Sequence, residues 1–372
     1  MRVEDCRVED LVEVVSVKTD LADYPMAAGV EQEVLVYDAA QLTKDAKAEL
    51  ARALKDGPGI FVIKGAFGND EVEAVTKEFQ GMIADQRAAG QQAGDHFAKP
   101  GANDRVWNAL EKLALRAPEA FANYYSSDVL ATVAEAWLGP AYQVTSQVNV
   151  VNPGGEGQTV HRDYHLGFQS NDVAASFPDH VHQLSAVLTL QGAVAHCDMP
   201  VESGPTLYLP HSQKYELGYL AWRLPEFGEY FVADHVQLPL AKGDAVFFNP
   251  ALFHAAGSNH SQDIYRMANL LQISSAFGRA MESVDRTTMS KMLYPTLRKL
   301  KASGTVDRLL DNVVAASAEG YSFPTNLDRD QPIGGLAPLS QADVVRQALA
   351  EDWPAEHLQQ TLTEHDHRRR TS

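Results

Sequence analysis

The sequence predicts a mainly β core with flanking α-helices, of the sandwich or jelly-roll type. Apolar and polar residues alternate from Tyr142 to Val151, which is typical of a strand with one polar face. Several short strand-like segments follow, separated by turns such as Asn152-Pro153-Gly154-Gly155 and Lys242-Gly243-Asp244. Helical periodicity dominates on either side. The pattern divides one domain, residues 1–372, into three parts.

The first part, residues 1–140, is expected to be mostly helical with one strand. The first helix should stop at Gly57-Pro58-Gly59, and the apolar run Ile60–Ile63 then predicts a buried strand. Asn69 is a suitable N-cap for the next helix. Helical spacing of apolar residues predicts helices at 43–55, 69–89, 104–115 and 128–138.

The middle part, residues 141–275, should contain the β core. Many short strands joined by turns indicate two packed sheets. After the strand at 142–151, further strands are predicted at 158–163, 184–190, 206–210, 235–240, 245–248 and 264–273.

The last part, residues 276–372, is expected to be helical again. Helical spacing continues from about Arg286 to Ala318 and returns near Gln341–Glu351, after a loop that contains prolines. We expect the charged tail, His365–Ser372, to be frayed.

Composition limits the function classes. The formal net charge of −18, from 31 basic and 49 acidic residues, argues against binding to nucleic acid or to an anionic membrane, because the long-range field repels both. Two cysteines cannot make a disulfide framework, and the N-terminal residues lack the apolar core of a signal peptide, so a reducing cytoplasm is expected. No apolar run is long enough to span a bilayer. The sequence does not predict an oligomeric state.

The most informative motif is His161-Arg162-Asp163, with His254 and Arg266 far downstream. Two imidazoles and one carboxylate are the ligands that hold non-haem Fe(II) on one face of its octahedron and leave the opposite face open. Residues i and i+2 of a strand share a face, so His161 and Asp163 could reach one metal. For either histidine alone, a hydrogen-bonded core residue is the alternative.

Arg266 lies on a predicted strand face that is otherwise apolar, next to the hairpin that carries His254. A buried guanidinium is costly unless it meets an anion, and its fork of donors suits the far carboxylate of a 2-oxo acid that chelates the iron. The alternative is that Arg266 pairs with an interior Asp or Glu. A second His-x-Asp, His196-Cys197-Asp198, competes for the metal assignment but runs into Met199-Pro200, the start of a loop.

Two longer segments carry a resemblance to a known family. Residues 57–67, GPGIFVIKGAF, are similar to the early helix-to-strand segment of the phytanoyl-CoA dioxygenase family, and 198–210, DMPVESGPTLYLP, resemble its acidic loop, turn and strand. The likeness extends over roughly residues 45–275. It accounts for Asp198 as a loop residue and therefore leaves His161 and Asp163 as the metal pair. Ser203-Gly204 and His211-Ser212-Gln213 depart from the family pattern, which puts the substrate in doubt but touches no metal ligand.

The resemblance implies a double-stranded β-helix (a cupin-like jelly roll) and a catalytic domain that uses Fe(II), 2-oxoglutarate and O2. His161, Asp163 and His254 would be the catalytic metal ligands, and Arg266 would bind the distal carboxylate of 2-oxoglutarate. Hydroxylation of a small-molecule C–H bond, with release of succinate and CO2, is favoured because related halogenases lack the carboxylate that Asp163 supplies; desaturation or ring formation is also compatible. Further candidates for cosubstrate binding are Thr206, Ser258, Gln147 and Thr159, each of which could equally be structural.

Two other functions are compatible with the residues. His161-x-Asp163-x-His165 could belong to a zinc hydrolase, although residues four apart on a strand lie about 13 Å from one another, too far to share one ion unless the chain turns sharply. Tyr164, His165 and Phe168 are expected at the substrate entrance, with ordinary packing as the alternative. A jelly roll that binds a metabolite without catalysis is the remaining possibility. His180, His182, Trp222 and Arg223 are further candidates for substrate contact, and nothing in the sequence selects the substrate.

Overall fold

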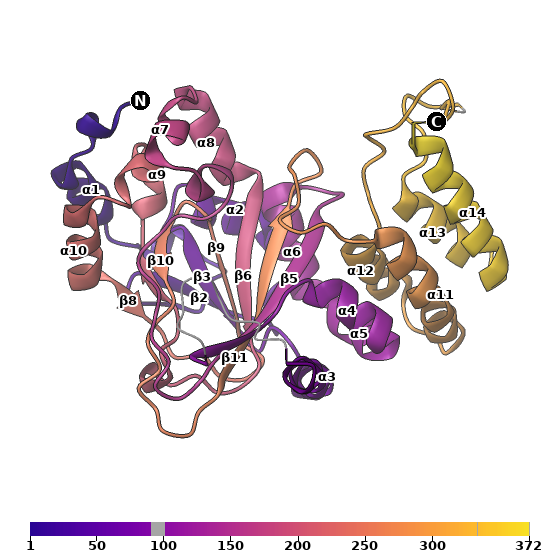
Figure 1. Ribbon diagram of the computed structural model, residues 1–372, viewed down its shortest axis with the longest axis horizontal. Helices are drawn as coiled ribbons and strands as arrows, with labels where there is room; N and C mark the ends of the chain where they lie inside the picture. The colour runs from indigo at the N-terminus through magenta and orange to yellow at the C-terminus, as the bar shows by residue number, and fades with distance from the viewer. Residues whose placement is uncertain (91–100, 333, 372) are drawn as a thin grey trace.

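The computed structural model describes residues 1–90, 101–332 and 334–371. Its centre is a sheet of eight strands in the order β1-β2-β3-β9-β6-β11-β5-β4, and a second sheet has the order β10-β7-β8 (Figure 1). Only the β2–β3 pair is parallel among the described strands. The strands of the large sheet are β1 Gly29–Glu31, β2 Val34–Asp38, β3 Ile60–Lys64, β4 Asn103–Val106, β5 Gln143–Val151, β6 Thr189–Ala195, β9 Ala245–Phe248 and β11 Arg266–Ser274; those of the small sheet are β7 Leu207–Leu209, β8 Val236–Gln237 and β10 Phe253–Ala255.

Helices cover one face of the large sheet, whereas α1 and α10 pack against the small sheet. Figure 1 shows α11 to α14 gathered at one side of the molecule, with α1, α9 and α10 on the opposite side. None of the helices in the described residues is both long and apolar enough to cross a membrane. Their bounds are α1 Val8–Val15, α2 Lys47–Lys55, α3 Asn69–Ala88, α4 Ala109–Arg116, α5 Pro118–Tyr125, α6 Asp128–Leu138, α7 Asn171–Ala175, α8 Asp179–Val187, α9 Gly218–Ala221, α10 Pro225–Asp234, α11 Arg286–Ala302, α12 Asp307–Ser317, α13 Gln341–Ala350 and α14 Ala355–Arg369.

The two faces of the large sheet have different partners because successive side chains of a strand point to opposite sides. In β6, Leu190 and Val194 belong to the main core, which the helices complete. Ala193 points the other way and packs in a second cluster with Phe248 of β9 and Tyr208 of the small sheet. The space between the two sheets is where the candidate site lies.

The sequence predicted a β core within residues 141–275, but the large sheet also contains strands from residues before 141. β3 pairs antiparallel with β9, β2 pairs with β3, and β4 pairs with β5, so segments from the first part complete the sheet. β4 also occupies the start of the helix predicted at 104–115, and α4 begins only at Ala109. Pairing partners far away in the sequence decide these strands, and local periodicity does not reveal them.

Two predicted strands are wrong in whole or in part. Residues 158–163 form no strand but a single bridge between His161 and His254, because Gly157 and Gln158 follow the backbone of the loop at 256–258 instead. The segment predicted as a strand at 184–190 is helical up to Val187, and β6 begins at Thr189. The helix buries His182, whose Nε2 lies 2.9 Å from the carbonyl oxygen of Ala174.

The charged tail was expected to be frayed, but its described residues are ordered by contacts with the rest of the chain. It continues α14 to Arg369, because His365 is buried with Nε2 3.0 Å from the carbonyl oxygen of Leu339, and Arg368 pairs with Asp330 at 3.1 Å. These contacts to the preceding loop hold a segment whose composition is typical of an exposed end.

Candidate metal and cosubstrate site

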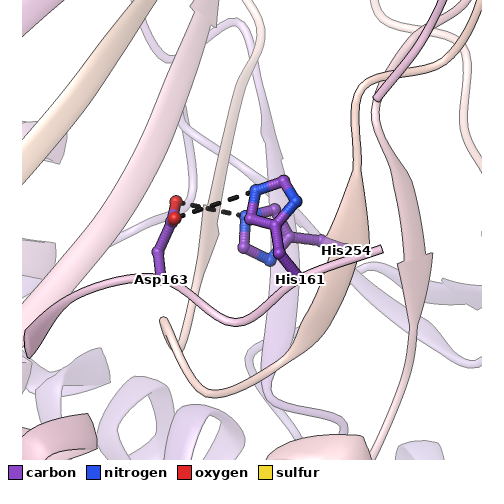
Figure 2. Close-up of side chains that lie close together, drawn as sticks. All are labelled: His161, Asp163 and His254. Atoms are coloured by element: carbon purple, nitrogen blue, oxygen red, sulfur yellow. Dashed lines mark ion pairs between the residues drawn. The ribbon is translucent and has the colours of Figure 1, made fainter. Parts of the chain in front are cut away.

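Three side chains converge between the sheets. His161 and His254 are paired across the bridge, with His161 N donating to His254 O at 2.9 Å and His254 N donating to His161 O at 3.1 Å. This pairing places both rings on one side, with centroids 4.4 Å apart. Asp163 lies two residues further along, where its N–H donates to the carbonyl oxygen of Pro250 at 3.1 Å. One possible ligand atom from each of the three residues lies within 4.8 Å of the other two (Figure 2).

The distances fit one metal ion. His161 Nε2 lies 3.7 Å from Asp163 Oδ1, and His254 Nε2 lies 3.4 Å from Asp163 Oδ2 (Figure 2). Ligand atoms on one face of an octahedron, with bonds of about 2.1 Å, lie about 3 Å apart. A small contraction would therefore bring the three atoms into bonding distance of a single ion.

Backbone carbonyls set the tautomer of both histidines. His161 Nδ1 lies 2.9 Å from Thr159 O, and His254 Nδ1 lies 2.9 Å from Leu252 O. Because a carbonyl oxygen only accepts, each Nδ1 must carry a hydrogen, and each Nε2, which lies toward Asp163, can present a lone pair to a metal or, in the protonated imidazole, a hydrogen to the carboxylate. An imidazole held through its other nitrogen in this way is the usual arrangement of a metal-binding histidine.

The surroundings of Asp163 favour its ionised form. Burial alone raises the pKa of this carboxyl group, but His161 and the hydrogen bond with His254 outweigh burial, so the pKa lies below its usual value. Gln191 Nε2 also donates to Asp163 Oδ2 at 2.5 Å. A carboxylate with two imidazole nitrogens matches the donor set that non-haem iron takes.

Arg162 anchors the segment that carries two of these residues. Its side chain is buried and donates to the carbonyl oxygens of Ser212 at 2.5 Å and Tyr215 at 2.9 Å. The guanidinium also lies 5.0 Å from the ring centre of Phe253, the neighbour of His254. Burial lowers the pKa of Arg162 to about 10, which leaves it charged at neutral pH. Arg162 thus ties the His161–Asp163 segment to the chain beside β10.

A cavity of about 360 Å³ adjoins the three converging residues. Arg266 lines it, is only 5% exposed, and forms no ion pair with any carboxylate in the described residues. Burial lowers the pKa of Arg266 to about 10, so the guanidinium keeps its charge at neutral pH. The alternative of an interior Asp or Glu partner finds no support among the described residues. An anion entering the cavity would give this buried cation a partner.

The other predicted residues have different positions. Thr206, Gln147 and Phe168 line the cavity, whereas Thr159 is exposed and Ser258 Oγ accepts a hydrogen bond from Gly157 N at 2.9 Å. Thr159 does not share a strand face with His161, since no strand forms there. Gln147 is already engaged, because its Oε1 accepts from Arg105 at 2.8 Å and its Nε2 donates to Gln272 at 3.2 Å.

The chain turns sharply after Asp163, and this separates His165 from the three residues. Tyr164 and His165 both have positive φ, of 64° and 41°. His165 Nδ1 lies 3.2 Å from Ser185 Oγ, and His165 lines a separate cavity beside α7 and α8. Tyr164 is buried and does not line the cavity of Arg266. The geometry therefore does not favour the zinc hydrolase that uses His165 as a ligand.

The competing histidine motif and the remaining candidates lie elsewhere. His196 is buried, with Nδ1 2.8 Å from Thr76 Oγ1 and Nε2 3.1 Å from Tyr124 OH, so it is a hydrogen-bonded core histidine. Arg223 stacks on Trp222 at 3.8 Å. The described residues that line the cavity of Arg266 do not include Trp222, Arg223, His180 or His182.

Sequence reasoning missed several residues that line the cavity. Gln191 had a detectable signal, since it is an amide within the apolar run Leu188–Val194 of a strand. Arg105 and Trp107 had none, because their segment was assigned to a helix. The missed polar and aromatic lining residues are Arg105, Trp107, Asn149, Gln158, Gln191, Tyr208, Phe248 and Gln272.

The family model for phytanoyl-CoA dioxygenase (PhyH) matches residues 56–268 of the chain. Since this match spans more than half of the 372 residues, the chain belongs to the phytanoyl-CoA dioxygenase family. The members of this family are non-haem iron enzymes that depend on 2-oxoglutarate and use Fe(II) and O2. No curated protein matches the chain.

Several solved structures are similar at low identity. The carbocyclase SnoK from nogalamycin biosynthesis is 21% identical with a TM-score of 0.44, over 68% of this chain and 92% of that one. HygX from Streptomyces hygroscopicus, with nickel, 2-oxoglutarate and hygromycin B bound, is 17% identical with a TM-score of 0.46, over 66% of this chain and 92% of that one. The epimerase SnoN, in complex with Fe3+, alpha ketoglutarate and nogalamycin RO, is 19% identical with a TM-score of 0.41, over 62% and 85%.

Proposed function

We propose that this chain is an Fe(II)- and 2-oxoglutarate-dependent dioxygenase that hydroxylates a C–H bond of a small molecule and releases succinate and CO2. His161, Asp163 and His254 are the proposed metal ligands, and Arg266 is the proposed partner of the distal carboxylate of 2-oxoglutarate. The observation that carries the proposal is the position of a buried arginine, without an acidic partner among the described residues, in the same cavity as the three converging side chains.

Each residue has a separate task in this proposal. Bound iron with 2-oxoglutarate and O2 supplies the oxidising chemistry. The two imidazoles and Asp163 would hold the iron beside the cavity, where the cosubstrate and oxygen would have room to bind. Arg266 orients the cosubstrate through a charge-assisted contact in a place with little water. Thr206, which lines the same cavity, is the second candidate for this carboxylate.

The carboxylate of Asp163 favours hydroxylation. A small residue at this position would leave a coordination position for halide, whereas Asp163 presents its oxygens to both imidazoles at 3.4 and 3.7 Å. Gln191 holds one of these oxygens. A side chain fixed from two directions suits a permanent metal ligand better than a displaceable one.

We also propose that the two sheets form the double-stranded β-helix of a single catalytic domain. Its support is the arrangement of β7 and β10 opposite the inner face of β6, β9 and β11, with the cavity between them. In such a fold the two sheets act as rigid walls, so the converging side chains need little rearrangement to bind a metal.

The test uses the anaerobic protein with Fe(II) and 2-oxoglutarate. A weak visible charge-transfer band should appear, and admission of air should lead to slow succinate formation without any added substrate. His161→Ala should abolish both signals, because it removes one of the three proposed ligands. His180→Ala, which changes an exposed histidine of α8, is the matched control and should retain both.

Two outcomes would contradict the proposal. A band of unchanged strength in His161→Ala would place the metal elsewhere. Failure of the wild-type protein to form succinate with Fe(II), together with an activity restored by zinc alone, would favour a hydrolase.

A further inference from the structure

Three glutamine side chains from neighbouring strands line one part of the cavity. They are Gln147 of β5, Gln191 of β6 and Gln272 of β11, and Gln191 lies directly opposite Gln272 in the pairing of their strands. Gln147 links Arg105 to Gln272 through the two hydrogen bonds described above. Amides donate and accept without carrying charge, so the only charge among these four side chains is that of the Arg105 guanidinium.

Gln191 differs from its two neighbours in one respect. Its Nε2 donates to Asp163, and since a carboxylate oxygen cannot face an amide oxygen favourably, this bond directs Oε1 away from Asp163. Gln191 is only 6% exposed and Oε1 has no hydrogen-bond partner. Among the described residues that line the cavity, no other side chain has a buried oxygen without a hydrogen-bond partner. Proteins retain few such acceptors, and this one lies beside a proposed metal ligand.

The rest of the lining limits what can approach that acceptor. Asp163 is the only carboxylate among the described residues that line the cavity, and Arg266 has its proposed task in binding 2-oxoglutarate. The other cation of the described lining, Arg105, donates to Gln147 and lies 4.7 Å from the ring centre of Trp107. Phe168 and Met281, which are 50% and 37% exposed, supply an apolar rim together with Trp107. An aliphatic chain alone would leave Gln191 Oε1 without a donor, and the several charges of a CoA ester would meet a protein of net charge −18.

We propose, on the basis of the function proposed above, that the substrate is a neutral molecule carrying a hydroxyl or N–H group and that Gln191 Oε1 accepts a hydrogen bond from this group. The same amide then holds a metal ligand through Nε2 and the substrate through Oε1. A ring or short chain packs against Phe168 and Met281, and its donor points to β6.

The experiment measures binding to the anaerobic protein loaded with Fe(II) and 2-oxoglutarate, by calorimetry. The probes are trans-cyclohexane-1,2-diol and its dimethyl ether, which have the same ring and the same oxygens but differ in hydrogen-bond donors, and hexanoyl-CoA. The diol should bind about tenfold more tightly than the ether, because only the diol satisfies the buried acceptor. Hexanoyl-CoA should bind more weakly than the diol.

The variant Gln191→Met locates the effect. It should bind the diol and the ether with affinities that differ by less than about twofold, since the acceptor is gone. Gln360→Met makes the same chemical change on the exposed surface of α14 and should keep the tenfold ratio. Because the ratio compares two probes on one protein, a general weakening of the metal site through the lost contact with Asp163 cancels.

Several results would overturn the inference. Equal binding of diol and ether to the wild-type protein would mean that water alone serves Gln191, and tighter binding of hexanoyl-CoA would indicate a different substrate class. A tenfold ratio that persists in Gln191→Met would place the acceptor elsewhere. The wild-type ratio needs no variant, so a misfolded variant leaves the test in place. Succinate formation without any probe shows separately whether the proposed function itself holds.

Discussion

Replacing Arg266 by methionine should have opposite effects on stability and on cosubstrate binding. Burial lowers the pKa of Arg266 from 12.5 to about 10, which at 1.36 kcal/mol per pKa unit corresponds to about 3 kcal/mol of destabilisation of the charged side chain in the folded protein. Methionine has a similar length and no charge. Without 2-oxoglutarate, the free energy of unfolding of Arg266→Met should therefore exceed that of the wild type by about 1 to 3 kcal/mol.

With 2-oxoglutarate the stability advantage of the variant should shrink, because the variant has lost the partner of the distal carboxylate. Loss of a charge-assisted contact should weaken binding by about 10- to 100-fold. At a cosubstrate concentration 100 times the wild-type dissociation constant, ligand binding should stabilise the wild type by about 2.7 kcal/mol and the variant by about 0.4 to 1.4 kcal/mol.

Urea unfolding of the anaerobic Fe(II) protein, with and without 2-oxoglutarate, measures both effects. Arg279→Met removes the same charge from an exposed position and should change neither quantity by more than about 0.5 kcal/mol. The reasoning is refuted if Arg266→Met is less stable than the wild type by several kcal/mol without cosubstrate, since Arg266 would then be a structural residue. Unchanged cosubstrate stabilisation would refute it as well.

Two further predictions concern stability and the metal. Gly218→Ala would place a Cβ 1.9 Å from Cζ of the buried Arg162, so it should lower the free energy of unfolding by about 1 to 3 kcal/mol and weaken Fe(II) binding. The control, Gly228→Ala in α10, has open space around the new Cβ and should raise the free energy of unfolding by about 0.5 to 1 kcal/mol. Equal free energies of unfolding of the two variants in urea would contradict the packing argument. Burial, with a smaller effect of Lys242, lowers the pKa of His196 to about 3, so the unfolded chain takes up the proton more readily and stability should fall as pH drops below about 6.5, by about 2 kcal/mol between pH 7 and pH 5. His196→Gln lacks this loss, so the stability difference between wild type and variant should narrow by that amount over the same pH range; a constant difference would mean that His196 is not buried in its neutral form.

Local patterns in the sequence predicted several elements closely. The alternation at 142–151 corresponds to β5, Gln143–Val151, and the helix at 128–138 has the bounds of α6. The helix expected from Asn69 is α3, although its N-cap is Gly68. Such elements are predictable because the spacing of their own apolar residues decides which face is buried.

The site was predictable in part. The residues that converge were identified from their order and from the family resemblance, but the argument that His161 and Asp163 share a strand face is wrong. They come together because His161 forms a single bridge with His254 and because the carbonyl of Pro250 receives the N–H of Asp163. Gln191 could have been noticed as an amide in an apolar strand, whereas Arg105 could not.

The sequence by itself determined the types of ligand, the charge of Arg266 and the period of each long element, since these depend on residues within a few positions of one another. Only the tertiary structure decided that β3 lies beside β9, that His165 turns away from His161, and that the amide of Gln191 faces Asp163. These arrangements depend on contacts between segments far apart in the chain, whose energies come from joint burial and are not encoded in any single segment.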